Sequence, residues 1–270
     1  MTQYERSKKE IKKLMKNIAG KYRLYQVFRD FIVLSACTIS NRVDKSQFES
    51  REKMYMDTIA KYDKEEADKF AEMLALTVLA YESKMGDFIG ELYMEMEFGN
   101  EDTGQFFTPY HVSKLMAGLV DVRPDKKGII TLNEPASGSG GMIVAYAERL
   151  MLEGINYQKQ LRVVCNDIDY DVVKMCYIQL SLLGIDAVVM QGDTITLKMN
   201  EIWYTPMHIL NKVREQRENR TKRMIDAMNK LMQLEQEPKK ESALVVPEGQ
   251  MTIFDYLEGF DGEEKQKKTS

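Results

Sequence analysis

Two short stretches of the sequence carry residue types that could bind a nucleotide-like ligand. GQFFTP spans Gly104 to Pro109, and further along the chain NEPASGSGGM spans Asn133 to Met142. Gly138 and Gly140 can take backbone angles that other residues resist, and without side chains they let a ligand approach the main chain. Gly141 opens a predicted helix, whose free N–H groups favour an acidic group on the ligand. The second stretch therefore predicts a cofactor-binding turn, whereas the aromatics and Thr-Pro of the first are not what a generic nucleotide-binding domain needs.

Carboxylates accompany this turn. Asp167 ends the second predicted strand, where such folds place a carboxylate on ribose hydroxyls, and Asp193 ends the third strand at the same edge. GSGG is too compact for the dinucleotide pattern G-x-G-x-x-G, and Glu134 and Pro135 precede it directly. A carboxylate at Glu134 suits a ligand with a positive ammonium group, as in S-adenosylmethionine, better than a pyrophosphate. The alternative is a glycine turn that serves only the chain topology.

The elements around these residues alternate between strand and helix periods. GIITLNEP (128–135), LRVVCND (161–167) and AVVMQGD (187–193) are short and β-branched, and the segments between them have a helical period closed by Gly154 and Gly184. This order predicts an α/β fold, a parallel sheet with right-handed crossovers.

The flanking regions differ from this core. Residues 1–100 contain no Pro, and their apolar residues recur at helical spacing, which predicts a bundle of about four helices. After Asp193 we expect NEIWYTPMHIL to be irregular, the following charged segment to form one long helix, and the end to be a flexible tail. The predicted domains are a helical bundle at 1–100, a partial Rossmann-like core at 101–206, and an extended charged helix and tail at 207–270.

Composition excludes several classes. The net charge of −4 gives no global attraction to nucleic acid, so DNA contacts would need a local basic face. Cys37, Cys165 and Cys176 lack metal-ligand spacing and predict reduced, buried thiols, and with only two histidines we expect no metal site. The sequence shows no signal peptide and no run long enough to span a bilayer, so a cytoplasmic protein without membrane contact is expected.

Taken together, GQFFTP, NEPASGSGG, NDID (Asn166 to Asp169) and QGD (Gln191 to Asp193) resemble the modification subunits of type I restriction systems and related adenine-N6 DNA methyltransferases. The resemblance implies an S-adenosylmethionine-dependent Rossmann-like core acting on DNA, in which the Phe-x-Thr-Pro loop holds the cofactor's amino-acid end. Glu134 stands where the family usually has Asp. The resemblance assigns to the cofactor Phe107, Thr108, Pro109, Glu134, Pro135, Ala136, Ser137, Gly138, Ser139, Gly140, Asp167 and Asp193.

The family's target-base motif, an Asn/Asp-Pro-Pro-aromatic turn, is absent from the sequence. In such enzymes this turn accepts the hydrogens of the adenine amine and stacks on the flipped base. The nearest segment, IWYTPMH, offers only Tyr204 and Pro206 as catalytic candidates, and the alternative is a loop anchor in which Trp203 covers the sheet edge. Three interpretations stay open: a divergent methyltransferase completed by a specificity or catalytic partner subunit, a cofactor-binding relative without catalysis, or a DNA-binding or interaction module.

Two further segments suggest partners. Gln250, Met251, Ile253 and Phe254 in QMTIF resemble the pentapeptide that docks bacterial proteins on the replication sliding clamp, although such short matches also arise by chance. The predicted long helix and the segment Lys21 to Arg29 are basic enough to follow a DNA backbone, but interleaved acids fit a solvated or oligomerising helix equally. The main prediction is therefore an S-adenosylmethionine-binding relative of adenine-N6 DNA methyltransferases, and the alternative is an inactive accessory protein of DNA replication, transfer or anti-restriction.

Overall fold

A four-stranded sheet in the order β1-β2-β3-β4 carries the predicted cofactor residues. The computed structural model describes residues 1–96, 98, 106–120 and 123–236, the side chains of 231–236 excepted. The chain divides into two units, Met1–Arg217 and Glu218–Ser270, and the sheet lies in the first. Strands β1, β2 and β3 are parallel, and β4 pairs antiparallel with β3. Their bounds are Ile130–Glu134, Leu161–Asp167, Asp186–Asp193 and Lys198–Tyr204.

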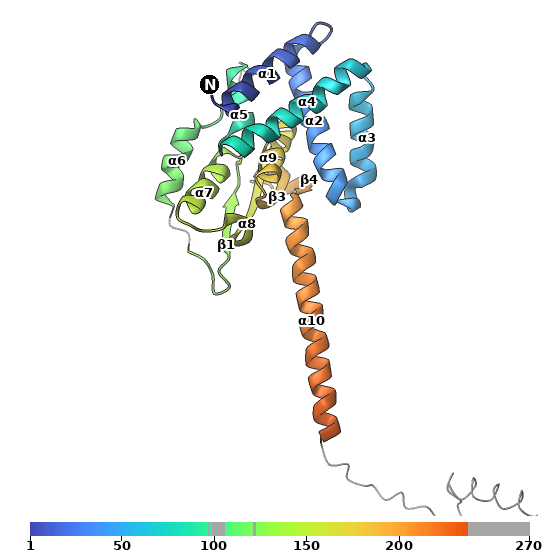
Figure 1. Ribbon diagram of the computed structural model, residues 1–270, viewed down its shortest axis with the longest axis vertical. Helices are drawn as coiled ribbons and strands as arrows, with labels where there is room; N and C mark the ends of the chain where they lie inside the picture. The colour runs from blue at the N-terminus through green and yellow to red at the C-terminus, as the bar shows by residue number, and fades with distance from the viewer. Residues whose placement is uncertain (97, 99–105, 121–122, 237–270) are drawn as a thin grey trace, which may run out of the picture. The chain divides into compact units, whose positions relative to one another are not determined.

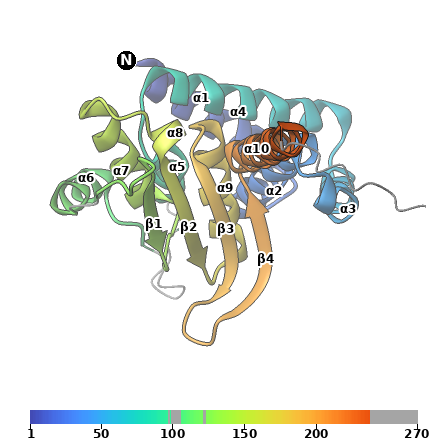
Figure 2. The same ribbon diagram turned by 90° about the horizontal axis from the view of Figure 1, so that it is seen from below.

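The crossovers between the parallel strands are helical, as the sequence predicts. Helix α7 (Gly141–Leu152) and the short α8 (Tyr157–Gln160) join β1 to β2, and α9 (Tyr170–Leu182) joins β2 to β3. Right-handed crossovers that advance in one direction place their helices on one face of the sheet, which Figure 2 shows. Gly154 and Gly184 follow α7 and α9 with φ of 78° and 68°, so the predicted helix ends are confirmed.

Strand β4 corrects one prediction, because NEIWYTPMHIL is not irregular. Asp193 accepts hydrogen bonds from the backbone N–H groups of Ile195 and Thr196, and this turn reverses the chain into β4. Trp203 on β4 is fully buried against Tyr177, at a ring-centroid distance of 5.0 Å. Burial of this large side chain stabilises a strand that has no regular alternation of polar and apolar residues.

The amino-terminal region is helical. It contains the helices α1 (Gln3–Ile18), α2 (Leu24–Val43), α3 (Phe48–Ile59), α4 (Lys64–Ser83) and α5 (Phe88–Glu95), with a 3₁₀ turn at Lys45–Gln47. Capping explains the sharp start of α4, where Asp63 and Glu66 form a reciprocal capping box. Helix α6 (Tyr110–Leu119) follows the Phe-Phe-Thr-Pro loop and packs on α7.

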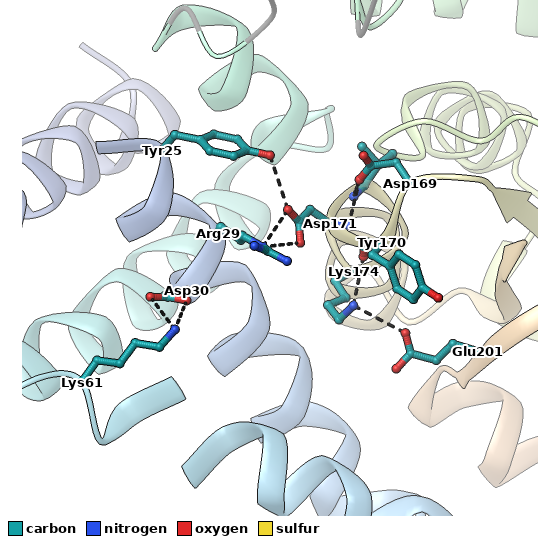
Figure 3. A network of polar contacts seen from close by, with 10 residues as sticks. Tyr25, Arg29, Asp30, Lys61, Asp169, Tyr170, Asp171, Lys174 and Glu201 are labelled. Atoms are coloured by element: carbon teal, nitrogen blue, oxygen red, sulfur yellow. Dashed lines mark hydrogen bonds and ion pairs between the residues drawn. The ribbon is translucent and has the colours of Figure 1, made fainter. Parts of the chain in front are cut away.

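Helix α2 packs on α9, so the helical region and the sheet share one hydrophobic core. At the end of this interface Arg29 Nε lies 3.0 Å from the carboxylate of Asp171 on α9, and Tyr25 donates to the same carboxylate (Figure 3). Lys61 pairs with the buried Asp30, the residue next to Arg29 on α2 (Figure 3). These contacts lie within the unit Met1–Arg217, and the predicted domain division stays a prediction.

Helix α10 (Pro206–Gln236) begins directly after β4 (Figure 1). Thr205 stabilises this junction because its buried hydroxyl accepts from the N–H of Ala187 at 2.9 Å and donates to the carbonyl of Ile185 at 2.8 Å. The three cysteines are free and buried, as predicted. Among the described residues, no helix combines the length and the apolar character needed to cross a membrane.

Candidate functional site

The glycine turn connects the carboxyl end of β1 to the start of α7. Gly138 and Gly140 have φ of +54° and +97°, the left-handed region that glycine adopts without strain. A Cβ at Gly140 would lie 3.0 Å from the sulfur of Cys176, so the turn lies tightly against α9. The N–H of Ser137 donates to the carbonyl of Asn166 at 2.9 Å and holds the turn against β2. The backbone of this turn is therefore fixed by packing on both sides.

The Phe-Phe-Thr-Pro loop meets this turn, as the sequence argument requires. A Cβ at Gly138 would lie 3.2 Å from the ring of Phe107, so the ring packs directly on the turn. The loop is held by α6, whose Tyr110 donates to Glu148 on α7 at 2.8 Å. Between loop and turn lies a cavity of about 110 Å³, called the small cavity below. It is lined by Asp87, Phe106, Phe107, Thr108, Ser113, Ala136, Ser137, Gly138, Ser139, Gly141 and Met142.

A larger cavity of about 520 Å³ adjoins the small one on the other side of the loop. Phe107, Thr108 and Asp87 line both cavities, while Pro109 lines only the larger one. Lys84 and Lys114 contribute positive charge to its wall, and Glu91 and Glu95 contribute negative charge. The predicted loop residues therefore border two cavities rather than one.

The predicted carboxylates lie at the carboxyl ends of their strands, but none lines the small cavity. Asp167 accepts hydrogen bonds from the N–H groups of Gly138 at 2.9 Å and Asp169 at 3.1 Å. Asp193 accepts from the turn that follows β3, and these backbone hydrogen bonds hold its pKa below the usual carboxyl range. Glu134 accepts from the N–H of Ala136 at 3.3 Å. Asp167 is thus joined directly to the glycine turn, whereas Asp193 and Glu134 are held by their own turns.

Side-chain bonds tie the carboxyl ends of the parallel strands together. Asn166 donates to the carbonyl of Gly192 at 3.0 Å and to the hydroxyl of Thr194 at 2.6 Å. The Thr194 hydroxyl in turn donates to the carbonyl of Pro135 at 2.8 Å. The segments after β1, β2 and β3 are therefore connected where a ligand would bind, a location typical of open parallel sheets.

Behind the glycine turn lies a buried polar cluster that the sequence analysis did not identify. Asp87, before α5, accepts from Ser139 Oγ at 2.9 Å and from Gln179 Nε2 at 2.8 Å. Gln179 also accepts from the N–H of Ile89 at 3.2 Å and from the hydroxyl of Tyr81. Gln179 is fully buried in α9, but this helix also carries Asp171, Lys174 and Ser181, so its sequence does not single out Gln179. No local sequence pattern pointed to Asp87.

The catalytic candidates lie at the other end of the sheet. Tyr204 pairs with Val188 near the start of β3, five residues before Asp193, which corresponds to about 16 Å along the strand. Its ring stacks on His208 at a centroid distance of 5.2 Å, and Pro206 is the first residue of α10. Trp203 next to it lies under Arg51, 4.0 Å from the guanidinium. This placement favours packing roles for the segment rather than contact with a base at the glycine turn.

The basic segments have different surroundings. Arg29 of the first segment is engaged by Asp171 (Figure 3), so it contributes to the interface between α2 and α9. On α10 the basic residues are exposed, and so are the acidic residues between them. Among the residues of α10 whose side chains are described, the exposed basic ones are Lys212, Arg214, Arg217, Arg220, Lys222, Arg223 and Lys230.

Two other predictions concern the docking peptide near the end of the sequence and metal binding. The predicted docking residues Gln250, Met251, Ile253 and Phe254 lie outside the described residues. Within the described part of the chain, no group of three or more His, Cys, Asp or Glu side chains could hold a metal ion.

Comparison with known proteins identifies a family for the central part of the chain. Residues 84–212 match the family model described as N-6 DNA Methylase. No curated protein matches the sequence. The predicted resemblance to adenine-N6 DNA methylases, whose cofactor is S-adenosylmethionine, is therefore confirmed for these residues.

Two solved structures are similar at 14% sequence identity. One, from Listeria monocytogenes, is provisionally described as a class I S-adenosylmethionine-dependent methyltransferase. The match covers 67% of this chain and 52% of that protein, with a TM-score of 0.35. The other is the type I restriction-modification system methyltransferase subunit from Streptococcus thermophilus. The match covers 68% of this chain and 57% of that protein, with a TM-score of 0.33. The chain thus spans little more than half the length of either protein.

Proposed function

From the match of residues 84–212 to the N-6 DNA methylases, we propose that this chain binds S-adenosylmethionine between the Phe107–Pro109 loop and the glycine turn. The observation that carries the proposal is the small cavity, because two segments far apart in the sequence line it together. The N-terminal end of α7, which borders the small cavity at Gly141, suits the polar amino-acid end of the cofactor. Asp167, hydrogen-bonded to Gly138, is positioned for the ribose hydroxyls.

Isothermal titration calorimetry with S-adenosylmethionine tests this proposal. Asp167→Asn should weaken binding about tenfold or more, because a carboxylate accepts two ribose hydroxyls more strongly than an amide. Asp125→Asn is a matched control, since Asp125 also accepts two backbone N–H groups, from Lys127 and Ile129, but lies before β1 at the other end of the strand. No heat of binding with the wild-type chain, or equal losses in both variants, would contradict the proposed site.

We further propose that the cofactor serves methyl transfer to adenine in DNA and that a partner subunit supplies the target-base residues. Within the described residues β1 pairs only with β2, so its other edge carries unpaired backbone groups next to the glycine turn. Such an edge is a template for a further strand. On β1, Thr131 and Asn133 are exposed, which leaves room for a polypeptide on this part of the sheet.

Transfer of a labelled methyl group to unmodified DNA tests the enzymatic part. The proposal expects incorporation when the chain is mixed with a cognate specificity or catalytic subunit, and little with the chain alone. DNA contact through α10 would give an affinity that falls steeply with salt, and removal of Arg220 and Arg223 would reduce the slope. An unchanged slope in that variant would assign the DNA contact to other residues.

The placement of Tyr204 favours a second candidate function, that of an accessory protein that binds the cofactor without catalysis. Tyr204 is stacked on His208 at the start of α10, and it lies near the opposite end of β3 from the glycine turn. Cofactor binding without incorporation, even with a cognate partner present, would support this candidate over the enzyme. Docking on a sliding clamp through Gln250–Phe254 stays a prediction for the same candidate, tested by pull-down with Gln250→Ala and Phe254→Ala.

A further inference from the structure

A buried carboxylate borders the proposed cofactor site from the helical region. Asp87 caps the start of α5, where it accepts from the N–H of Gly90 at 3.1 Å, and only 3% of the residue is exposed. It lines both the small cavity and the larger one. A Cβ at Gly141 would lie 2.7 Å from Asp87 Oδ2, so the glycine leaves the space that this carboxylate occupies beside α7.

Every hydrogen-bond donor that Asp87 has among the described residues is neutral. They are the N–H of Gly90, the hydroxyl of Ser139 and the amide of Gln179, and no ion pair within 4.0 Å involves Asp87 in the described part of the chain. Burial raises the pKa of Asp87, while the bonds from Gln179, Ser139 and Gly90 oppose that rise. The nearby charge of Glu91 also raises it. A buried negative charge with no cation is costly, and such groups are normally paired or bind a positive ligand.

A second group on the same cavity wall lacks a partner. Ser113 is fully buried, and its hydroxyl has no hydrogen-bond partner among the described residues. Ser113 stands on α6 and also lines the small cavity. A ligand group with several hydrogen-bond donors and a positive charge would satisfy both the hydroxyl and the carboxylate.

We propose that Asp87 binds the α-ammonium group of the cofactor's amino-acid end, with Ser113 as a second acceptor; this rests on the proposed function. The sequence argument gives that task to Glu134, but Glu134 does not line the small cavity and its carboxylate accepts from its own turn at Ala136. Asp87 is the one carboxylate among the described residues that lines the space between the loop and the turn. The ammonium ion therefore meets a charge supplied by the helical region rather than by the sheet.

The alternative role for Asp87 is purely structural, as a connection between the starts of α5 and α7. Ligands that differ in the amino-acid end separate the two roles. Decarboxylated S-adenosylhomocysteine keeps the ammonium group, whereas 5′-methylthioadenosine lacks the whole amino-acid end, and both are uncharged thioethers at sulfur. The inference expects the wild-type chain to bind the first about tenfold to hundredfold more tightly than the second, the range of one charge-assisted hydrogen bond. A wild-type chain that does not distinguish them would overturn the inference without the use of any variant.

Asp87→Asn keeps the shape of the side chain and can still accept from Gln179, so the fold should be retained. We expect this variant to lose about tenfold to hundredfold in affinity for both ammonium-bearing ligands and to bind 5′-methylthioadenosine as the wild type does. A structural role would weaken all three ligands alike and would refute the inference. Loss of the distinction in Glu134→Gln instead of Asp87→Asn would assign the ammonium group to Glu134. If the wild type bound none of the three ligands, the proposed function itself would fail.

Discussion

Gly140→Ala offers a direct test of the left-handed turn beneath the proposed cofactor site. Gly140 has φ of +97°, well beyond the left-handed minimum near +57°, so an alanine there would cost at least about 1–2 kcal/mol in backbone strain. The new Cβ would lie 3.0 Å from the sulfur of Cys176 and 3.6 Å from its Cα, which adds an overpacking cost of about 1–3 kcal/mol. Together these terms predict a loss of about 2–5 kcal/mol in the free energy of unfolding.

Thermal and urea unfolding followed by circular dichroism would measure this loss. For a unit of this size the melting temperature should fall by about 4–20 °C. Gly118→Ala is the control, because Gly118 lies inside α6 with open space at its Cβ, and alanine there should stabilise by up to about 1 kcal/mol. Cys176→Ala combined with Gly140→Ala should recover part of the stability that overpacking removes. It should not relieve the backbone strain at position 140. A Gly140→Ala chain as stable as the wild type would refute the reasoning.

Three further variants test other parts of the structure. Arg51→Met should lower the free energy of unfolding by about 3–5 kcal/mol in urea titrations, because the buried Arg51 pairs with Asp44 at 3.0 Å and donates to the carbonyl of Ile202. Burial raises the pKa of Asp186, but hydrogen bonds from His208 and Asn211 outweigh burial and hold this pKa below its usual value of 3.8. The ionised Asp186 therefore stabilises the fold above that pH, and this contribution is lost on acidification. Asp186→Asn should therefore cost about 1–3 kcal/mol at pH 7 and less at pH 3, and an equal cost at both would contradict the assignment. Tyr204→Ala should leave cofactor affinity within about twofold in calorimetry, since Tyr204 lies far from the glycine turn; a larger loss would place it near the ligand.

Local sequence patterns were sufficient for the parallel part of the fold. The strand at Leu161–Asp167 lies where its β-branched run predicts it, and the helices between the strands end before the glycines that punctuate them. Strand β4 was not predicted because its stability depends on contacts made across the chain. Trp203 is buried by Tyr177 and Arg51, which are 26 and 152 residues away in the sequence. No window of sequence contains that information.

The candidate site, like the fold, could be predicted only in part from the sequence. The turn at Gly138–Gly140 was predicted from its glycines and its place after a strand, the loop at Phe107–Pro109 from the family resemblance, and both border the cavities. The sequence assigned Asp167 to the ribose hydroxyls and Glu134 to an ammonium group, but it could not predict which hydrogen bonds hold Glu134, Asp167 and Asp193 in the fold. Their differences come from local hydrogen bonds, and only Asp167 is joined to the glycine turn.

The helical region contributes to the site and does not only flank it. Tyr81 on α4 and Asp87 before α5 both bond to Gln179 on α9, and Asp87 also accepts from Ser139 in the glycine turn. The predicted domain boundary lies near residue 100, where a polar, glycine-bounded segment interrupts the sequence. This boundary would remove Tyr81 and Asp87 from the Rossmann-like part. The family match begins at residue 84 and so includes Asp87. A fragment that starts at residue 101 would leave the Ser139 hydroxyl without its acceptor Asp87 and Gln179 Oε1 without its donors Tyr81 and Ile89, and such losses are costly. We therefore expect the glycine turn to take its ligand-binding conformation only with the α4–α5 segment in place.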